Sequence, residues 1–312
     1  MSMTAPLHGP LMIHDLTQIY KLKIKSEYDL TDLGPIHWLL GIKMTRDCEN
    51  CTISLSQLSY IDSLLRWFNF TDLRPFLTPM ELNIWYSKNQ CPQKPEQATE
   101  MRHIPYCKAV GSLIYLAMAT CPDIAFPIGI LLQFMDNPEW VHREGVKHIF
   151  WYLAGMRDWV SVYEMKVKGL EGFTGVDGAM QEHRHAIMGY AFLIDGGAVS
   201  WSSKKQEIVT RSTTESEYVA TTHATKEAIW LCWFIGELFQ QLTNPIPLYS
   251  DSQAAIVTHD GSYHVRTKHI DIQYHFIWFI IDNGMINLIY CPTDDMVTNT
   301  LTKALPNIKG SI

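Results

Sequence analysis

Apolar and polar residues alternate with different periods along the chain, and these periods predict its first elements. Thr17–Tyr28 has the pattern of a helix, and a turn follows it. Two runs with a period of two, Trp38–Thr45 and Thr52–Leu55, predict the strands of a β-hairpin. Tyr60–Phe68 repeats its apolar residues at the spacing of an amphipathic helix. This part of the chain is therefore predicted to be a small α+β unit.

The middle of the chain is predicted to be helical. Residues 81–104 are polar and contain prolines, which is typical of a linker. Three apolar segments follow and predict buried helices: Pro105–Ala119, Ile124–Phe134 and Pro138–Leu153. Pro127 falls inside the second segment, where an interior proline costs about 3 kcal/mol. We therefore expect that helix to kink or to restart near Pro127.

Beyond residue 171 the pattern changes to short strands separated by helices. The order of three strands, a helix, a strand, helices, a strand and a helix predicts an α/β fold in which helices cover a mixed sheet. The strands are expected at 172–176, 186–194, 198–203, 247–249 and 285–290, and the helices at 213–239, 252–258, 269–281 and 295–305. In the longest helix, we expect Trp230, Trp233, Phe234 and Leu238 to pack in the core.

These patterns divide the chain into six predicted segments. They are an irregular leader (1–16), an α+β unit (17–80), a linker (81–104), a helical connection (105–170), an α/β domain (171–306) and a short tail (307–312). A hydrophobic fraction of 47% with 18% charged residues is typical of a folded globular protein.

Composition excludes several classes of function. No apolar run has the length of a membrane helix, and the N-terminus lacks the basic flank and apolar core of a secretory signal. We therefore expect an intracellular protein, cytoplasmic or nuclear, with no membrane partner, and nothing in the sequence indicates a small-molecule substrate. The seven cysteines fit reduced thiols better than a disulfide framework. Cys48 and Cys51 have zinc-knuckle spacing without a second pair, so we interpret them as part of a hairpin turn.

The charge balance argues against strong binding of nucleic acid. The net charge is −7, and residues 171–312 carry 9 basic and 15 acidic residues. Neutralisation of phosphates supplies most non-specific affinity for nucleic acid, and an acidic protein lacks that contribution. Any basic surface must therefore be local.

One stretch carries candidate chemistry. Ser212–Glu215 has the pattern of a capping box whose first residue is the N-cap, and Glu217 follows in the first turns of the helix. The turn before it is basic and polar, with Lys204, Lys205 and Gln206. A carboxylate beside a basic turn suits a metal-dependent nuclease, but an ordinary solvated helix start has the same pattern. The residues alone leave both interpretations open.

Several motifs in a fixed order carry a family resemblance. They read GFTGVDGA (172–179), VSWSSKKQ (199–206), RSTTESEYVA (211–220), LYSDSQAAI (248–256), KHIDIQYHF (268–276) and LTKALP (301–306). This order resembles the ribonuclease H domain of copia-type LTR retrotransposon Pol polyproteins. Upstream, DLGPIHWLLGIKMTRD resembles the end of the reverse transcriptase, and GSLIYLAMATCPDIAF resembles the connection segment.

The resemblance implies both a fold and a limit on activity. It implies a ribonuclease H-like mixed five-stranded sheet with helices on both faces, preceded by a mostly helical connection and a reverse transcriptase remnant. The family's polymerase motif, Tyr-x-Asp-Asp, does not occur in this sequence, so no polymerase activity is expected.

The resemblance also implies a site. The family cuts the RNA strand of an RNA–DNA hybrid with two Mg²⁺ ions held by four carboxylates, because Mg²⁺ prefers oxygen ligands. Matched by position, the helix carboxylate is Glu217 and the fourth-strand carboxylate is Asp251. The first-strand aspartate falls on Gly175 and the last-helix aspartate on Asn299. Because two of the four carboxylates are absent, we expect Mg²⁺ binding to be impaired and the RNA strand not to be cleaved.

Candidate contacts to a hybrid backbone are expected on the basic turn and on a later helix. They are Lys204, Lys205, Gln206, Lys268 and His269, and a solvated turn and helix start is the alternative interpretation. Because few basic residues remain, any binding of nucleic acid is expected to be weak. At five further positions the family commonly has arginine, which indicates mutational decay: Cys121, His148, Trp151, Gln273 and Trp278.

Two other functions remain open. Asp177 lies two residues beyond Gly175 on the same strand face, about 6.6 Å along the strand. An active Mg²⁺-dependent ribonuclease H would therefore have to use Glu217, Asp251 and Asp177. The chain could also serve as a non-enzymatic module that binds nucleic acid or protein.

Overall fold

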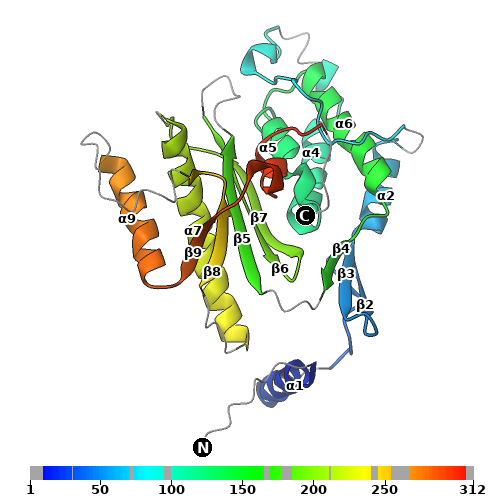
Figure 1. The fold of residues 1–312 in the computed structure, drawn as a ribbon. Coiled ribbons are helices and arrows are strands. Elements are labelled where there is room, and N and C mark those ends of the chain that lie inside the picture. Colours follow the sequence, from blue (N-terminus) through cyan, green and yellow to red (C-terminus); the bar gives the residue numbers. More distant parts are fainter. Residues whose placement is uncertain are drawn as a thin grey trace, which may run out of the picture.

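The computed structural model contains two β-sheets with a group of helices packed beside them (Figure 1). It describes residues 10–29, 31–70, 74–94, 100–164, 169–177, 185–210, 212–239, 245–253 and 268–306. The predicted helix at 252–258 lies almost entirely outside these residues.

The first sheet is antiparallel, with the strand order β1-β2-β3-β4. The strands are β1 (Trp38–Leu39), β2 (Ile42–Asp47), β3 (Thr52–Ser56) and β4 (Ser161–Glu164). The predicted strand Trp38–Thr45 is divided by a tight turn, because Leu40 and Gly41 both adopt positive φ. Strand β4 is absent from the sequence prediction. It comes from the segment expected to be a helical connection and pairs with β3.

Four helices form the core beside this sheet: α2 (Leu58–Trp67), α4 (Tyr106–Ala119), α5 (Ala125–Leu132) and α6 (Trp140–Met156). They share one hydrophobic cluster, whose most deeply buried members include Leu64, Val110, Leu113, Leu116, Ile124, Ile149 and Phe150. The α+β unit and the connection are therefore packed against one another. Their predicted boundaries as separate domains remain a prediction.

The expected restart at Pro127 does not occur, because α5 (Ala125–Leu132) begins one residue after the predicted start and continues through Pro127. A short 3₁₀ helix, η2 (Pro122–Ile124), precedes α5, which begins at Ala125. Pro127 is thus the third residue of α5. The first four N–H groups of a helix have no acceptor within the helix, so a proline there loses no hydrogen bond.

Two segments predicted to be irregular contain structure. Helix α1 (Pro10–Glu27) begins inside the predicted leader, earlier than the expected start at Thr17. Within the predicted linker, η1 (Lys88–Gln90) is closed by a capping box from Ser87. Tyr86, from the same segment, is half-buried against α5 and α6 and contacts the ring of His142.

The second sheet has five strands in the order β7-β6-β5-β8-β9. They are β5 (Leu170–Asp177), β6 (Ile187–Ile194), β7 (Gly197–Lys205), β8 (Ile246–Ser250) and β9 (Ile286–Tyr290). The first three pair antiparallel, whereas β5, β8 and β9 pair parallel. This confirms the predicted mixed five-stranded sheet of an α/β fold.

Helices cover both faces of this sheet, as predicted. Alternation along β6 places Phe192 in a cluster with Ala224 and Ala228 of α7 (Thr213–Phe239). Its neighbours Ala191 and Leu193 face the other way and meet Leu301 of α10 (Asn299–Thr302). A third helix, α9 (Lys268–Asp282), packs beside α7 (Figure 1).

The helical connection also packs against the five-stranded sheet. Trp201 of β7 donates a hydrogen bond from its indole nitrogen to the carbonyl oxygen of Ala117 in α4, at 2.7 Å. Ile130 and Phe134, at the end of α5 and just beyond it, form a hydrophobic cluster with Ile187 of β6. Loss of these contacts would expose apolar surface on both partners.

The expectation that the aromatic residues of α7 lie in the core is wrong. Trp230, Trp233 and Phe234 are 54%, 66% and 47% exposed, and Leu238 is exposed as well. Small residues on the other side of the helix make the contact instead, with Ala220, Ala224 and Ala228 fully buried at a spacing of four. They allow the helix to approach the large rings of β6 closely.

The last predicted helix is also shorter than expected. Instead of Asp295–Leu305, the structure has a 3₁₀ turn, η3 (Thr293–Asp295), and the single turn of α10.

In the residues described, no helix combines the length and apolarity needed to cross a membrane. All seven cysteines are free thiols, in agreement with the prediction.

A buried histidine stabilises the start of α6. The Nδ1 atom of His142 accepts a hydrogen bond from the backbone N–H of Glu139 at 2.9 Å, and its ring stacks on Phe134. Its Nε2 atom is buried without a partner. Burial lowers the pKa of His142 to about 4, although the nearby carboxylate of Glu139 opposes the shift.

This lowered pKa predicts a loss of stability in acid. An unfolded histidine has a pKa of about 6.5, so between pH 6.5 and 4 the unfolded chain binds the additional proton. The contribution of His142 to the free energy of unfolding should therefore be greatest above pH 6.5. The free energy of unfolding should fall by roughly 1–3 kcal/mol as the pH is lowered towards 4. Urea denaturation across this range measures the effect.

The matched variant is His142→Asn, which keeps an acceptor for the Glu139 N–H but cannot be protonated. It should reduce the slope of stability against pH in this window. An unchanged slope in His142→Asn would contradict the assignment.

Candidate functional site

The first-strand and fourth-strand positions lie side by side at the ends of two parallel strands. Strands β5 and β8 pair Thr174 with Ser250. Gly175 and Asp251 are the next residues on each strand, and neighbouring strands run about 4.8 Å apart. The structure therefore brings together two of the four positions matched from the sequence.

The start of α7 is fixed by buried polar contacts. The hydroxyl of Ser212 accepts a hydrogen bond from the N–H of Glu215 at 3.2 Å, as the predicted N-cap should. Gln206 donates from Nε2 to the carbonyl of Ser216 at 2.9 Å and is 1% exposed. Gln206 therefore anchors the helix and does not lie at the surface, where a contact to nucleic acid was expected.

Glu217 follows in the first turns of α7 and is mostly shielded from water. Its Oε2 atom is buried without a hydrogen-bond partner. Burial, together with the negative charge of Asp251, raises the pKa of Glu217 to about 8. In the metal-free protein at neutral pH, the Glu217 carboxyl is therefore mainly protonated. The effect of the Asp251 charge on Glu217 also indicates that the two side chains face the same space.

The last-helix position is tied to the fourth-strand carboxylate through one threonine. The hydroxyl of Thr293 donates to Asp251 Oδ2 at 2.9 Å, and the carbonyl of Thr293 accepts from Asn299 Nδ2 at 2.5 Å. The amide group of Asn299 is thus used as a donor to the backbone. An aspartate at residue 299 would have no proton for this bond at neutral pH.

The space beside Gly175 is partly filled by α10's N-cap residue. A Cβ atom added at Gly175 would stand 2.8 Å from Thr298 Oγ1 and 3.9 Å from the methyl group of Met296. Thr298 is 1% exposed, so it has little room to move. Any side chain at residue 175 would therefore press against Thr298.

The charge that acts on Asp177 differs from the charges around Glu217 and Asp251, because Asp177 lies near Lys303. It lies at the end of β5 on the same strand face as Gly175, because side chains alternate with a period of two. Burial raises the pKa of Asp177, and the positive charge of Lys303 opposes this rise. The carboxylate of Asp177 is thus balanced by a lysine.

The residues present do not fit a pair of Mg²⁺ ions. A two-metal site needs several oxygen ligands around both ions. Within the described part of the chain, no group of three or more His, Cys, Asp or Glu side chains is placed to hold a metal ion. Glu217 and Asp251 supply two carboxylates, and Gly175 supplies no side-chain ligand.

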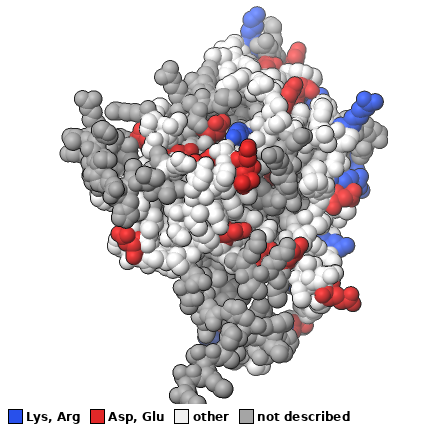
Figure 2. Space-filling model, viewed as in Figure 1, with Lys and Arg blue, Asp and Glu red and all other residues white. Residues whose placement is uncertain are grey.

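The predicted basic contacts are only partly available. Lys204 is exposed, but its amine pairs with Glu207 at 3.0 Å. Lys205 is half-exposed at the end of β7. Lys268 and His269 lie in the first turn of α9, and their side chains are outside the described part. In Figure 2, acidic residues are spread across the described surface of one face, whereas most of the basic residues lie towards its right edge.

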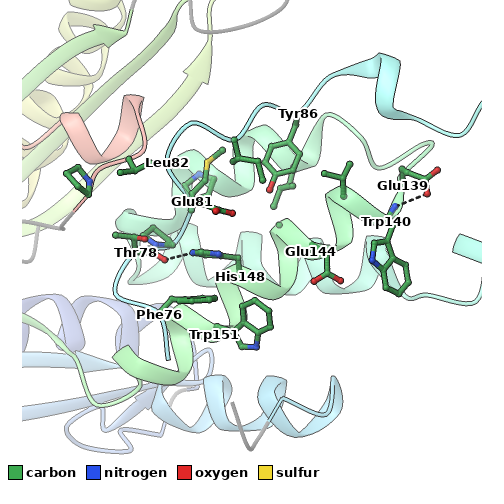
Figure 3. Close-up of a pocket in the computed structure, with 18 residues that line it drawn as sticks. Phe76, Thr78, Glu81, Leu82, Tyr86, Glu139, Trp140, Glu144, His148 and Trp151 are labelled. Atoms are coloured by element: carbon green, nitrogen blue, oxygen red, sulfur yellow. Dashed lines mark hydrogen bonds between the residues drawn. The ribbon is translucent and has the colours of Figure 1, made fainter. Parts of the chain in front are cut away.

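A pocket with a volume of about 970 Å³ lies elsewhere. Figure 3 shows it between the segment Thr78–Tyr86 and α6. His148 lies over the ring of Phe76 with centroids 4.4 Å apart and contacts the carbonyl of Thr78 at 2.9 Å. Trp151 meets Phe76 edge-on. Two positions where the family commonly has arginine thus contribute aromatic packing here.

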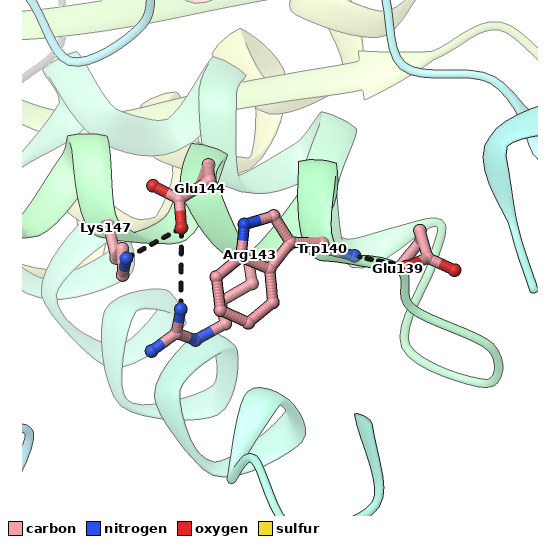
Figure 4. A network of polar contacts seen from close by, with 5 residues as sticks. All are labelled: Glu139, Trp140, Arg143, Glu144 and Lys147. Carbon is pink, nitrogen blue, oxygen red and sulfur yellow. Dashed lines mark hydrogen bonds and ion pairs between the residues drawn. The ribbon is translucent and has the colours of Figure 1, made fainter. Parts of the chain in front are cut away.

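The charged residues at the start of α6 neutralise one another (Figure 4). Glu144 accepts from Lys147 at 2.6 Å and from Arg143 at 3.4 Å. The guanidinium of Arg143 also lies 4.4 Å from the ring centroid of Trp140. These cations therefore have partners within their own helix.

Comparison with known proteins finds similar polyproteins from retrotransposons. No protein-family model matches the chain. Over 295 residues it is 38% identical to the retrovirus-related Pol polyprotein from transposon TNT 1-94 of Nicotiana tabacum, covering 93% of this chain and 22% of that protein. Over 305 residues it is 32% identical to the corresponding polyprotein from transposon RE1 of Arabidopsis thaliana, covering 96% and 20%. The chain is therefore similar to one segment of these retrotransposon Pol polyproteins.

The chain spans about a fifth of the length of these Pol relatives. Among solved structures it is similar to LC11-RNase H1 in complex with an RNA/DNA hybrid, at 16% identity and a TM-score of 0.31. That match covers 41% of this chain and 88% of the other, and it is too distant to support an inference about the site.

The motifs in this chain did not reveal Thr293, Thr298 or Lys303 as site residues. Each acts on a candidate residue from a different element: Thr293 on Asp251, Thr298 on the space at Gly175, and Lys303 on Asp177. The match of LTKALP to the family was the one sequence signal near them, and it did not indicate these contacts.

The close approach of Thr298 predicts a specific stability effect. Gly175→Ala should lower the free energy of unfolding by about 1–3 kcal/mol, because the new methyl group overlaps Thr298 Oγ1. Adding Thr298→Ala should recover most of this loss. Urea denaturation of both single variants and the double variant gives the coupling between the two sites.

Gly111 supplies the matched control. It lies on the exposed side of α4, and a Cβ atom there would meet nothing within 4 Å. Gly111→Ala should be neutral or stabilising by up to about 1 kcal/mol. Equal effects of Gly111→Ala and Gly175→Ala would refute the proposed overlap.

Proposed function

We propose that this chain is a Pol segment that ends in a ribonuclease H-like domain and does not cleave RNA–DNA hybrids. The observation that carries the proposal is the glycine at residue 175, between Asp251 on the next strand and Thr298 on α10. In the family, this position carries the aspartate that bridges both metal ions. Without it, the two ions share no ligand.

The electrostatics of the remaining carboxylates support the same conclusion. Burial raises the pKa of Glu217, and repulsion from the nearby carboxylate of Asp251 acts in the same direction. A pair of Mg²⁺ ions would relieve it only if enough charged ligands held both ions. Here Gly175 is without a ligand, and Asn299 is neutral and bonded to Thr293.

Binding of a hybrid is proposed to be weak. The domain from residue 171 has more acidic than basic residues, and phosphate binding depends on unpaired cations. Lys204 pairs with Glu207, and Gln206 is buried. Lys205, Lys268 and His269 remain candidates for contact with a backbone.

An active enzyme that uses Glu217, Asp251 and Asp177 is the second candidate. It is favoured by the position of Asp177, half-buried on the strand face of Gly175. Two features weaken it: the offset of about 6.6 Å along the strand, and the charge of Lys303 beside Asp177.

Cleavage of a hybrid with a labelled RNA strand, in Mg²⁺ and in Mn²⁺, tests the proposal. The natural chain should release no product above a metal-free control. The variant with Gly175→Asp, Asn299→Asp and Thr298→Ala should gain at least roughly 100-fold, since even outer partners of a metal ligand contribute up to that factor. The third change makes room for the new side chain at residue 175.

The decisive controls use Glu217 and Asp177. In the restored variant, Glu217→Gln should abolish cleavage and Asp177→Asn should not. If the natural chain itself cleaves and both Glu217→Gln and Asp177→Asn abolish that activity, the second candidate is correct and the proposal fails.

A further inference from the structure

Two cysteines stand opposite one another at the tip of the β2–β3 hairpin. The last pair of the ladder is Asp47 with Thr52, so the next residues on the two sides are Cys48 and Cys51. Both cysteines lie in the turn itself, just beyond this last pair, as its first and last residues. The hairpin therefore brings two thiols to one turn.

The turn that holds them is fixed by Asp47. Its carboxylate accepts hydrogen bonds from the N–H groups of Glu49 and Asn50, at 3.0 and 3.1 Å, and from the side chain of Asn50 at 2.7 Å. Cys51 closes the turn with a φ of +52°. The ends of such a four-residue turn lie within about 7 Å of one another, and disulfides span Cα distances of about 4.4–6.8 Å.

Both thiols are exposed, and one points back across the turn. Cys51 Sγ lies 3.7 Å from the carbonyl oxygen of Cys48. Cys107 is the other exposed cysteine of the chain, and its Sγ contacts the carbonyl of Met135 at 3.4 Å. The remaining four are partly or fully buried: Cys91, Cys121, Cys232 and Cys291.

We propose that Cys48 and Cys51 form a reversible thiol–disulfide site whose co-reactant is a low-molecular-weight disulfide, RSSR. The thiolate of one cysteine attacks RSSR, which forms a mixed disulfide and releases one RS⁻. The thiolate of the second cysteine then attacks the protein sulfur, which closes the Cys48–Cys51 bond and releases the second RS⁻. The two cysteines lose two electrons to RSSR, and their two protons pass to the two RSH molecules.

A disulfide accounts for the geometry better than a metal. A structural zinc site needs four ligands, and no group of three or more metal-binding side chains occurs in the described residues. Two sulfurs suffice for a disulfide. The second step is intramolecular, so it proceeds at the high effective concentration set by the short turn. Cys107 has no such second step and can form only a mixed disulfide.

Equilibration of the full chain in glutathione buffers of graded ratio, followed by alkylation and tryptic mass analysis, tests the site. Cys48 and Cys51 fall in one peptide, Asp47–Arg66, because no lysine or arginine separates them. This peptide should lose two hydrogen atoms without gaining glutathione. Closure should be half complete at a glutathione ratio at least tenfold more reducing than the ratio that half-modifies Cys107.

Three variants make the outcome decisive. Cys48→Ser should convert Cys51 into a glutathione adduct that forms only at the ratio typical of Cys107. Asp47→Ala should shift closure several-fold towards more oxidising buffers, because the turn loses its hydrogen bonds, whereas Cys107→Ser should leave closure unchanged. If Cys48 and Cys51 each carry glutathione at the ratio that modifies Cys107, with no closed peptide, the proposal is overturned.

Discussion

Strand β5 is paired along both edges and covered on both faces, and this constraint determines the candidate site. Its antiparallel ladder with β6 runs from Leu170 to Asp177, and its parallel ladder with β8 covers the middle of the strand. A slip of two residues would be needed to bring Asp177 to the place of residue 175, and it would break the register of both ladders although each side chain would keep its face. Residue 175 therefore stays beside Asp251 and Thr298, and Asp177 cannot move into its place.

The contacts made by other segments strengthen this constraint. Leu301 of α10 is fully buried against Ala191 and Leu193 of β6, so the turn that carries Asn299 and Thr298 is held on the sheet. The helical connection adds the bond from Trp201 to Ala117 and the packing of Ile130 on Ile187. The geometry of the site thus depends on segments that are distant in the sequence, and substitutions in the connection can act on it through packing.

Local patterns predicted most of the helices and strands, because the formation of these elements depends largely on residues that are neighbours in the sequence. Short β-like runs separated by turns located β6 and β7, and the Ser212 cap located the start of α7. Strand β4 was missed because its pairing with β3 joins distant parts of the chain. The burial of Trp230 was misjudged because α7 is apolar on several sides. The side that packs on the sheet is the one that carries the alanines.

The site was predictable only in part. Its four positions came from the resemblance to a family, and the register of β5 and β8 accounts for two of them physically. The approach of Thr298 to Gly175 and the bond of Asn299 to Thr293 depend on how α10 lies on the sheet. No motif or period of the sequence encodes such contacts directly.

The central claim is that the carboxylates left in this chain do not hold two metal ions. Anomalous diffraction from crystals of the full chain grown with Mn²⁺ and an RNA–DNA hybrid tests it most directly. The account predicts no pair of peaks beside Gly175 and at most one ion between Glu217 and Asp251. Two Mn²⁺ ions about 3.5–4 Å apart at this place, the separation of a two-metal site, would contradict it.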